Sequence, residues 1–169
     1  MNYLSLNDEK LLPVVIDLNT LLADYNMYYQ KLRLFHWNIL GKNFFDLHAH
    51  FEQMYTDARI KIDEIAERIL TLRYHPMSKL SDYLKVSNIS EVSPFLKDTE
   101  MIDNLISDHM KLLIQMRLVI ANAEKAKDEG TIDLMSGYIR ELEKSSWMLD
   151  AWASKKNIHL KKKVAPETV

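Results

Sequence analysis

The chain has 169 residues with a formal net charge of −2, so it can form one domain with a sizeable core and does not have the basic character of a nucleic-acid binder. It contains no cysteine, which excludes disulfides and thiolate metal sites, and only three glycines, which favours helices. The sequence has no signal-peptide pattern and no apolar run of membrane-spanning length, so we expect a single cytoplasmic domain over 1–169 without a membrane partner.

The first helix is predicted to begin between Asn7 and Pro13 and to continue to about residue 39, because apolar residues recur at steps of three and four. Proline is tolerated in a first turn, where its missing N–H has no partner to lose. His36 lies near the end of this helix, and by itself it indicates only a packed histidine bonded to a carbonyl. Gly41 and Asn43 then predict a tight turn, as the C′ residue of one helix and the N-cap of the next.

Four polar residues share one face of the second helix, which is predicted to end at about residue 74, before a proline. With His48 at zero, Glu52 falls at about 40°, Asp63 at about 60° and Glu67 at about 100°, whereas the apolar stripe centres at about −80°. Each i, i+4 pair can converge on one ion, but about 16 Å of helix separates the two pairs within one chain. The short turn also allows His36 to approach His48.

The spacing of these four residues is symmetric about a point between residues 57 and 58. A second, antiparallel copy related by a twofold axis there would bring His48 level with Glu67 of that copy, and Glu52 level with its Asp63. The pattern predicts two identical sites about 22 Å apart along the helix, each with ligands from both chains. Histidine and carboxylates suit iron or a similar divalent ion, since none of these ligands is soft.

The simpler alternative is a solvated helix face without a metal. In that interpretation the side chains that partner the carboxylates of Glu52, Asp63 and Glu67 are those of Arg59, Lys61 and Arg68.

The remaining helices complete a helical bundle. A short helix is predicted over 78–85 and a third long helix from about 98 to 127, on which His109 falls in the apolar stripe and indicates a satisfied core residue. Gly130 is predicted to stop this helix, and Thr131 to cap a fourth helix that continues to about residue 156.

Three segments, LFHWNILGKNFF, LHAHFEQMY and KIDEIAERIL, resemble the Dps family of mini-ferritins, the DNA-binding proteins from starved cells, and the likeness covers nearly the whole chain. The resemblance implies an all-α, ferritin-like four-helix bundle with a short extra helix between the second and third helices. It also implies a hollow homododecamer that oxidises Fe(II), preferably with hydrogen peroxide, stores Fe(III) mineral and protects DNA from oxidative damage. Matched by position, it implies the ferroxidase ligands His36, His48 and Glu52 from one subunit, with Asp63 and Glu67 from its twofold mate.

Three further positions bear on the resemblance. Ala49 and Gln53 stand where family members commonly have acids facing the cavity, which concerns mineral nucleation rather than oxidation. Asp133 matches the family's acidic residue at the threefold pore, which implies contact with entering iron. Its alternative role is to stabilise the first turn of a helix.

Three rival functions differ in class. A di-iron centre inside one subunit requires Glu-x-x-His pairs, and no glutamate here is followed three residues later by histidine. A helical interaction protein would bind no metal. A nucleoid-binding protein would protect DNA mainly by physical association, through a C-terminal tail that we expect to be flexible from about 157. The basic residues near that end are Lys155, Lys156, Lys161, Lys162 and Lys163. With the net charge of −2, these predict weak DNA binding.

Overall fold

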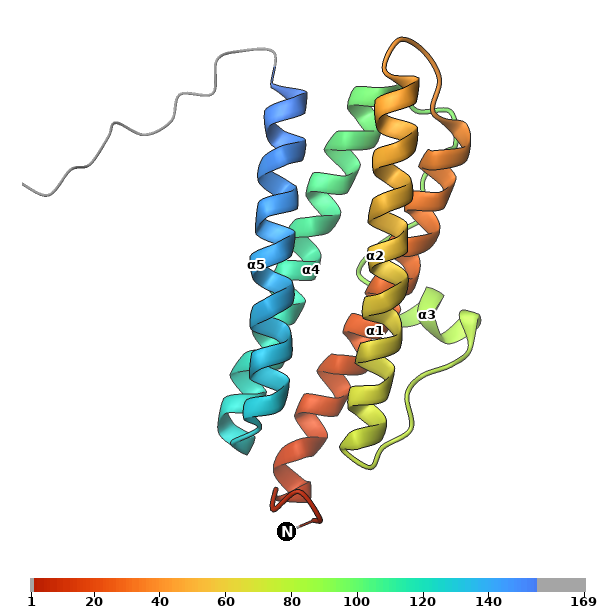
Figure 1. Ribbon diagram of the computed structural model, residues 1–169. Helices are drawn as coiled ribbons and strands as arrows, with labels where there is room; N and C mark the ends of the chain where they lie inside the picture. The colour runs from red at the N-terminus through yellow and green to blue at the C-terminus, as the bar shows by residue number, and fades with distance from the viewer. Residues whose placement is uncertain (1, 155–169) are drawn as a thin grey trace, which may run out of the picture.

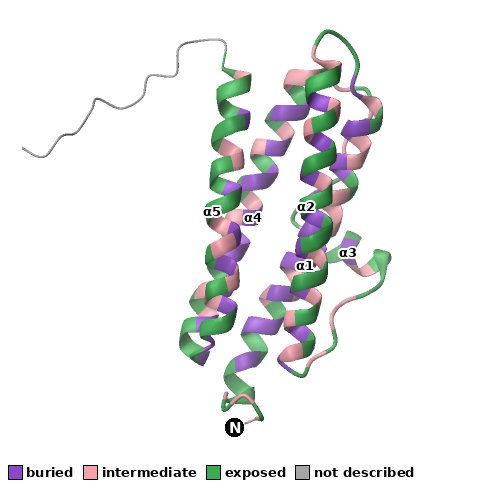
Figure 2. Ribbon diagram, in the orientation of Figure 1, coloured by how far each residue is buried: buried purple, intermediate pink, exposed green. Residues whose placement is uncertain are grey.

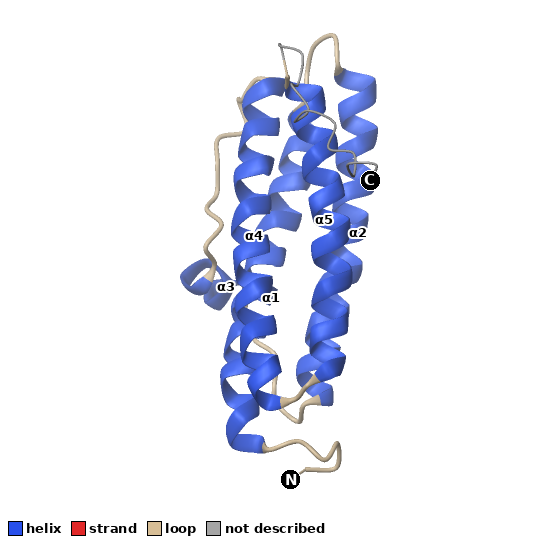
Figure 3. Cartoon of the chain, turned by 90° about the vertical axis from the view of Figure 1, so that its left-hand side faces the viewer, coloured by secondary structure: helices blue, strands red, loops and turns tan. Residues whose placement is uncertain are grey.

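The computed structural model describes residues 2–154, and in this range the chain forms five α-helices and no strand (Figure 1). They are α1 (Asp8–Asn38), α2 (Phe44–Thr71), α3 (Leu80–Val86), α4 (Asp98–Ala126) and α5 (Glu129–Ala153). α1 and α2 form one antiparallel pair, α4 and α5 form another, and α1 packs against α4. The short α3 packs on α1, outside the bundle (Figure 3). The predicted all-α bundle with a short extra helix is therefore confirmed.

The core forms where the apolar stripes of the four long helices face one another, as the burial pattern shows (Figure 2). α2 buries the predicted stripe and leaves its opposite face exposed. Full burial of one such side chain stabilises the fold by about 1.5–3 kcal/mol. The largest completely buried side chains are those of Tyr25, Phe35, Phe51, Leu11, Leu18, Leu21, Leu22, Leu32, Ile39, Ile65, Ile69 and Leu72.

Two polar clusters lie within this core. Lys31 and Asp108 form an ion pair of 2.5 Å, with both side chains buried. His109 is hydrogen-bonded through Nε2 to the Tyr28 hydroxyl at 2.6 Å and through Nδ1 to the Ser146 hydroxyl at 2.8 Å. The prediction that His109 is a satisfied core residue is confirmed, because both of its ring nitrogens have partners.

The two ends of α1 and the turn to α2 follow the predicted sequence signals in part. Asn7 caps α1, its side chain accepting from two first-turn N–H groups at 2.9 and 3.2 Å. Gly41 adopts a left-handed φ of 99°, but it lies two residues beyond the C-cap Ile39, so it shapes the turn without occupying the predicted C′ position. Asn43 occupies the N-cap of α2, but its side chain donates to Asp98 at 2.6 Å instead of capping the helix. The amide therefore ties this turn to the start of α4.

The predicted junction between α4 and α5 needs correction. Lys127 takes the left-handed conformation that ends α4, with φ of 58°, so Gly130 is not the residue that stops the helix. Asp128 is the N-cap of α5, and its carboxylate accepts from the Thr131 N–H at 3.1 Å and from the Thr131 hydroxyl at 2.6 Å. Thr131 thus lies inside the helix as a donor to the cap, because a carboxylate there can accept two hydrogen bonds at once.

The ends of α2 and α5 also differ from the prediction. α2 ends at Thr71, three residues early, because Arg73 takes a left-handed φ of 71° and closes the helix. α5 is described to Ala153. The expected end near residue 156 and the tail from about 157, with its lysines, lie outside the described residues. Among the residues described, no helix is long and apolar enough to cross a membrane.

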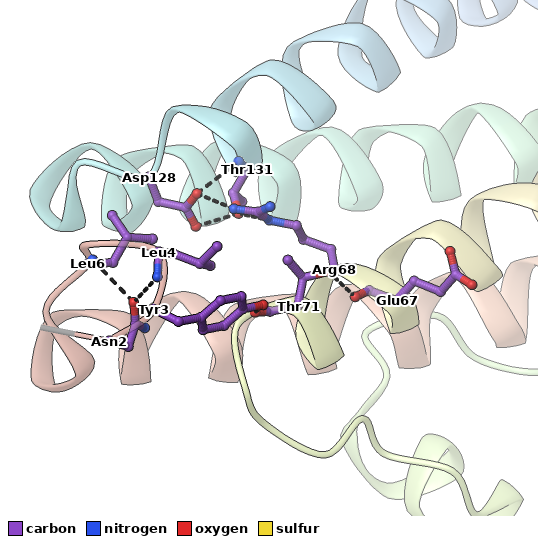
Figure 4. Close-up of polar contacts among 9 residues, drawn as sticks. All are labelled: Asn2, Tyr3, Leu4, Leu6, Glu67, Arg68, Thr71, Asp128 and Thr131. Carbon is purple, nitrogen blue, oxygen red and sulfur yellow. Dashed lines mark hydrogen bonds and ion pairs between the residues drawn. The ribbon is translucent and has the colours of Figure 1, made fainter.

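The N-terminal residues fold back onto the end of α2 (Figure 4). The Asn2 side chain accepts from the N–H groups of Leu4 and Leu6 at 3.0 and 3.2 Å, which closes a compact turn. The Tyr3 hydroxyl donates to the Thr71 carbonyl at 2.6 Å. Residues 2–6 are therefore held against the bundle.

Candidate metal centre

His36 and His48 lie face to face where α1 ends and α2 begins. Their ring centroids are 3.8 Å apart and their planes are inclined by 21°. Each Nδ1 donates to the backbone carbonyl of the other histidine, both at 2.8 Å. The turn therefore brings together the two histidines that lie twelve positions apart in the sequence.

These reciprocal bonds fix which ring nitrogens are available. A carbonyl oxygen only accepts, so the proton of each neutral ring lies on Nδ1 and the lone pair on Nε2. Metal-ligating histidines characteristically donate their second nitrogen to a carbonyl or carboxylate, which sets the tautomer and the ring orientation. Both histidines are thus prepared to bind a metal through Nε2.

The surroundings of the two rings are aromatic. Phe44 stacks on His48 with centroids 4.9 Å apart, and Tyr55 meets His36 edge-on at 5.3 Å. The Tyr55 hydroxyl donates to Glu52 Oε1 at 3.4 Å. Tyr55 therefore contacts both the α1 histidine and the first carboxylate of the predicted site. Neither Tyr55 nor Phe44 is among the residues predicted from the sequence, although Tyr55 follows Glu52 by three positions, which places both on one helix face.

Asp63 and Glu67 lie towards the other end of α2 and are both exposed. Within residues 2–154 their carboxylates take part in none of the hydrogen bonds or ion pairs of the structure. Arg68 contacts Asp128 and Thr131, and these three residues are here called the Arg68 cluster. In Figure 4 the Glu67 carboxylate points away from this cluster.

Two of the three cations that could have neutralised this face are bound elsewhere. Lys61 is only 5% exposed, and its ammonium contacts the carboxylates of Asp57 at 2.6 Å and Glu141 at 2.8 Å. Arg68 is ion-paired with Asp128 and donates to Thr131 at 2.9 Å. The solvated-face alternative therefore fails for Lys61 and Arg68, and it remains open only for Arg59.

One chain does not assemble a complete site. No three His, Asp or Glu side chains within the described part of the chain are gathered closely enough to hold a metal ion. This agrees with the helix length that separates the Glu52 end of α2 from the Asp63 end, about 16 Å. His36 and His48 are together, with Glu52 one turn from His48, whereas the other two predicted ligands are not brought to them.

Asp133 lies on α5 and is exposed. It lines a surface cavity of about 340 Å³ together with carboxylates that include Glu64 and Glu141. The acidic residue in the first turn of α5 is Glu129, so Asp133 lies one turn too far along the helix for the alternative role of stabilising that turn.

Comparisons with known proteins identify the structural class to which this bundle belongs. A family model described as a ferritin-like domain matches residues 17–157. A single long crossover between two helix pairs is the arrangement of that class of bundle.

Individual relatives narrow the class to one family, and the chain belongs to the Dps family. It is 42% identical to a DNA protection during starvation protein of Porphyromonas gingivalis, over 89% of this chain and 94% of that protein. It is 37% identical to DNA protection during starvation protein 2 of Bacillus anthracis, over 82% of this chain and 95% of that protein. The crystal structure of the Dps protein from Vibrio cholerae O1 superposes with a TM-score of 0.88 at 45% identity, covering 91% of this chain and 97% of that one.

Proposed function

We propose that this chain is a ferroxidase subunit that oxidises Fe(II) at sites shared between two chains and stores the Fe(III) mineral in a cage of twelve copies. The observation that carries the proposal is the pair of histidines held by reciprocal bonds, with both Nε2 atoms available. The proposed ligands are His36, His48 and Glu52 of one chain, with Asp63 and Glu67 of another. The Vibrio cholerae relative is described as one of the ferritin-like diiron-carboxylate proteins, which supports iron as the metal.

Exposed apolar residues on α2 support the twofold arrangement. Phe45 is 83% exposed and Leu70 is 51% exposed. On the helical wheel they lie at about 60° and about 40° from His48, on the same face as the ligands. Their midpoint falls between residues 57 and 58, like that of the ligand pairs, so an antiparallel copy would cover each Phe45 with the other chain's Leu70. Large apolar side chains that are exposed in one chain and would meet across the twofold axis are consistent with an interface between chains.

The donor set suits the proposed oxidation. Imidazole nitrogen and carboxylate oxygen bind Fe(II), and the harder carboxylates favour the Fe(III) product. Hydrogen peroxide takes one electron from each of two Fe(II) ions and leaves as two hydroxide ions. Consumption of both reactants would protect DNA, because Fe(II) and peroxide together are the source of damaging radicals.

Mixed assemblies test whether the site is shared. Asp63→Ala and His48→Ala should each abolish rapid peroxide-dependent oxidation, followed optically after adding Fe(II). Co-assembly of the two variants should restore part of the activity, because a mixed pair contains one site with every ligand and one site that lacks both.

The mixing experiment needs a matched control. His48→Ala mixed with Glu52→Ala should stay inactive, since both changes fall on the same half of the site and no mixed pair has an intact site. Confirmed co-assembly of the first pair without recovered activity would contradict a shared site.

DNA association is the second candidate function, since the Porphyromonas gingivalis relative is named a DNA protection during starvation protein and physical association is one way to protect DNA. Its support in this chain is weaker, because residues 2–6 are folded against α2 and the first ten residues hold one lysine. We propose that protection is chiefly chemical and that binding to DNA is weak.

A further inference from the structure

The face of α2 that carries the proposed ligands, here called the ligand face, also carries Arg59. Arg59 forms no ion pair within the described residues. It is exposed, and it takes part in none of the ion pairs formed within residues 2–154, whereas Lys61 and Arg68 are both engaged. On the helical wheel Arg59 lies at about 20° from His48, between His48 and Glu52. Asp63 follows it by four positions, so the two are neighbours on the same face.

The twofold arrangement places Arg59 beside the shared site. Asp63 would lie level with the second chain's Glu52, and Arg59 lies one turn, about 6 Å, from that level towards the twofold axis. The guanidinium group can therefore reach the carboxylate of Asp63 or that of the second chain's Glu52. This placement rests on the proposed function, because the neighbouring carboxylates belong to two chains.

The formal charges of the groups at the shared site give Arg59 a specific role. The shared site has three carboxylates, from Glu52, Asp63 and Glu67, and so a formal charge of −3. A guanidinium group stays protonated at any pH at which the protein is folded, so with Arg59 the charge is −2, which one divalent ion neutralises. A second divalent ion would enter a site that is already neutral and would leave it with a formal charge of +2.

We propose that Arg59 is a resident counter-cation of the shared site. It pairs with the carboxylates when the site is empty, weakens the binding of divalent ions, and limits tight binding to one ion per site. Arg59 is thus a specificity-determining residue that sets affinity and stoichiometry without itself binding the metal.

Calorimetric titration with Co(II) tests this in the assembled protein without any turnover. The unmodified protein should bind one Co(II) tightly per chain, since each pair of chains has two sites. Arg59→Gln should bind Co(II) about tenfold more tightly at low ionic strength, as expected for one charge acting on a divalent ion at roughly 6 Å in water. Arg59→Glu should bind more tightly still and gain a second ion per site. Arg59→Lys should match the unmodified protein to within about twofold.

The controls separate this inference from the proposed function. Arg140→Gln removes a charge from an exposed position on α5, and it should leave Co(II) binding unchanged. If the unmodified protein binds no Co(II) in a His48-dependent manner, the proposed function itself is wrong. If it binds Co(II) and Arg59→Gln has equal or lower affinity, the counter-cation role is wrong and the guanidinium only positions the carboxylates. Should Arg59→Gln fail to assemble, two tightly bound Co(II) ions per site in the unmodified protein would contradict the inference.

Discussion

Burial lowers the pKa of His109 to about 3, because the low-dielectric core disfavours its charged form. A lowered folded-state pKa stabilises the protein above the unfolded value of 6.5, and the stability is lost as pH falls towards the folded value. Between pH 7.5 and 5 we expect this residue alone to lower the free energy of unfolding by about 2 kcal/mol. In urea unfolding, His109→Gln should reduce the pH dependence by that amount. The exposed His75 provides the control, since His75→Gln should leave the pH dependence unchanged.

Asp133 should act on iron entry rather than on oxidation. Its exposed carboxylate lies in an acidic cavity, where fixed negative charge raises the local cation concentration. We expect Asp133→Asn to slow Fe(II) uptake several-fold in stopped-flow measurements. Oxidation of Fe(II) already bound should keep its rate when peroxide is added afterwards. Uptake kinetics equal to those of the unmodified protein would remove Asp133 from the entry path.

For individual residues, the sequence predicted which side chains share a helix face better than it predicted which side chains contact one another. The helical wheel placed Glu52, Asp63 and Glu67 on one exposed face because the rotation per residue is fixed by the helix. It could not predict the reciprocal histidine bonds, which depend on how the turn at Gly41 orients two backbone segments. Nor could it predict that Lys61 is buried, because its carboxylate partner Glu141 comes from a distant helix.

Among the elements, the C-terminal part of α2 is fixed by the Arg68 cluster (Figure 4). Arg68 spans from α2 to the start of α5, where it pairs with the buried Asp128. Arg68→Leu would leave that carboxylate buried without its partner, and we expect a loss of about 3 kcal/mol in urea unfolding.

A double variant checks the cause of this loss. Asn is also a good N-cap, so Asp128→Asn in the Arg68→Leu background should recover much of the stability by removing the unpaired charge. Arg117→Leu should cost less than about 1 kcal/mol, because the Arg117–Glu143 pair is exposed. No recovery in the double variant would show that packing of Arg68, rather than charge, holds the junction.

The helix boundaries were predictable where local signals act alone. α1 begins at Asp8, within the predicted range, because the Asn7 side chain caps the helix by bonding within the first turn. The prediction failed at the junction of α4 and α5, where Lys127 takes the left-handed conformation that glycine usually occupies. Asp128 caps α5 directly after it and pairs with Arg68 of α2, a tertiary contact that no local pattern contains.

For the whole molecule, we expect a closed twelve-subunit cage, measured by light scattering at neutral pH. Leu70→Glu should yield smaller assemblies without ferroxidase activity, because a charge would be buried against Phe45 of the second chain. The exposure of Leu70 in the subunit means that the change should not unfold it. Leu70→Met keeps an apolar contact and should assemble normally. A monomer or an isolated dimer of the unmodified protein would contradict the cage.

DNA binding by the assembled protein should be weak at moderate salt. Each chain has a formal charge of −2, so twelve copies repel phosphates at long range, and contacts from a few lysines are lost steeply with salt. Twelve tails acting together gain from effective concentration, so the measurement must cover low salt as well. A gel-shift series on linear duplex should show complexes only at the low end. Complexes that persist at physiological ionic strength, and disappear when residues after 157 are deleted, would reverse this expectation.

The separation of the two proposed ligand pairs along α2 has a kinetic consequence. Neither pair can reach the other within its own helix, so a newly synthesised or dissociated subunit would have two half-sites and no catalytic centre. Specific activity per chain should then depend on protein concentration. It should be constant while the subunits are paired, and it should fall steeply when the protein is diluted below the dissociation constant of the pair. Oxidation would thus begin only where a partner, and with it the compartment for the insoluble product, is already forming.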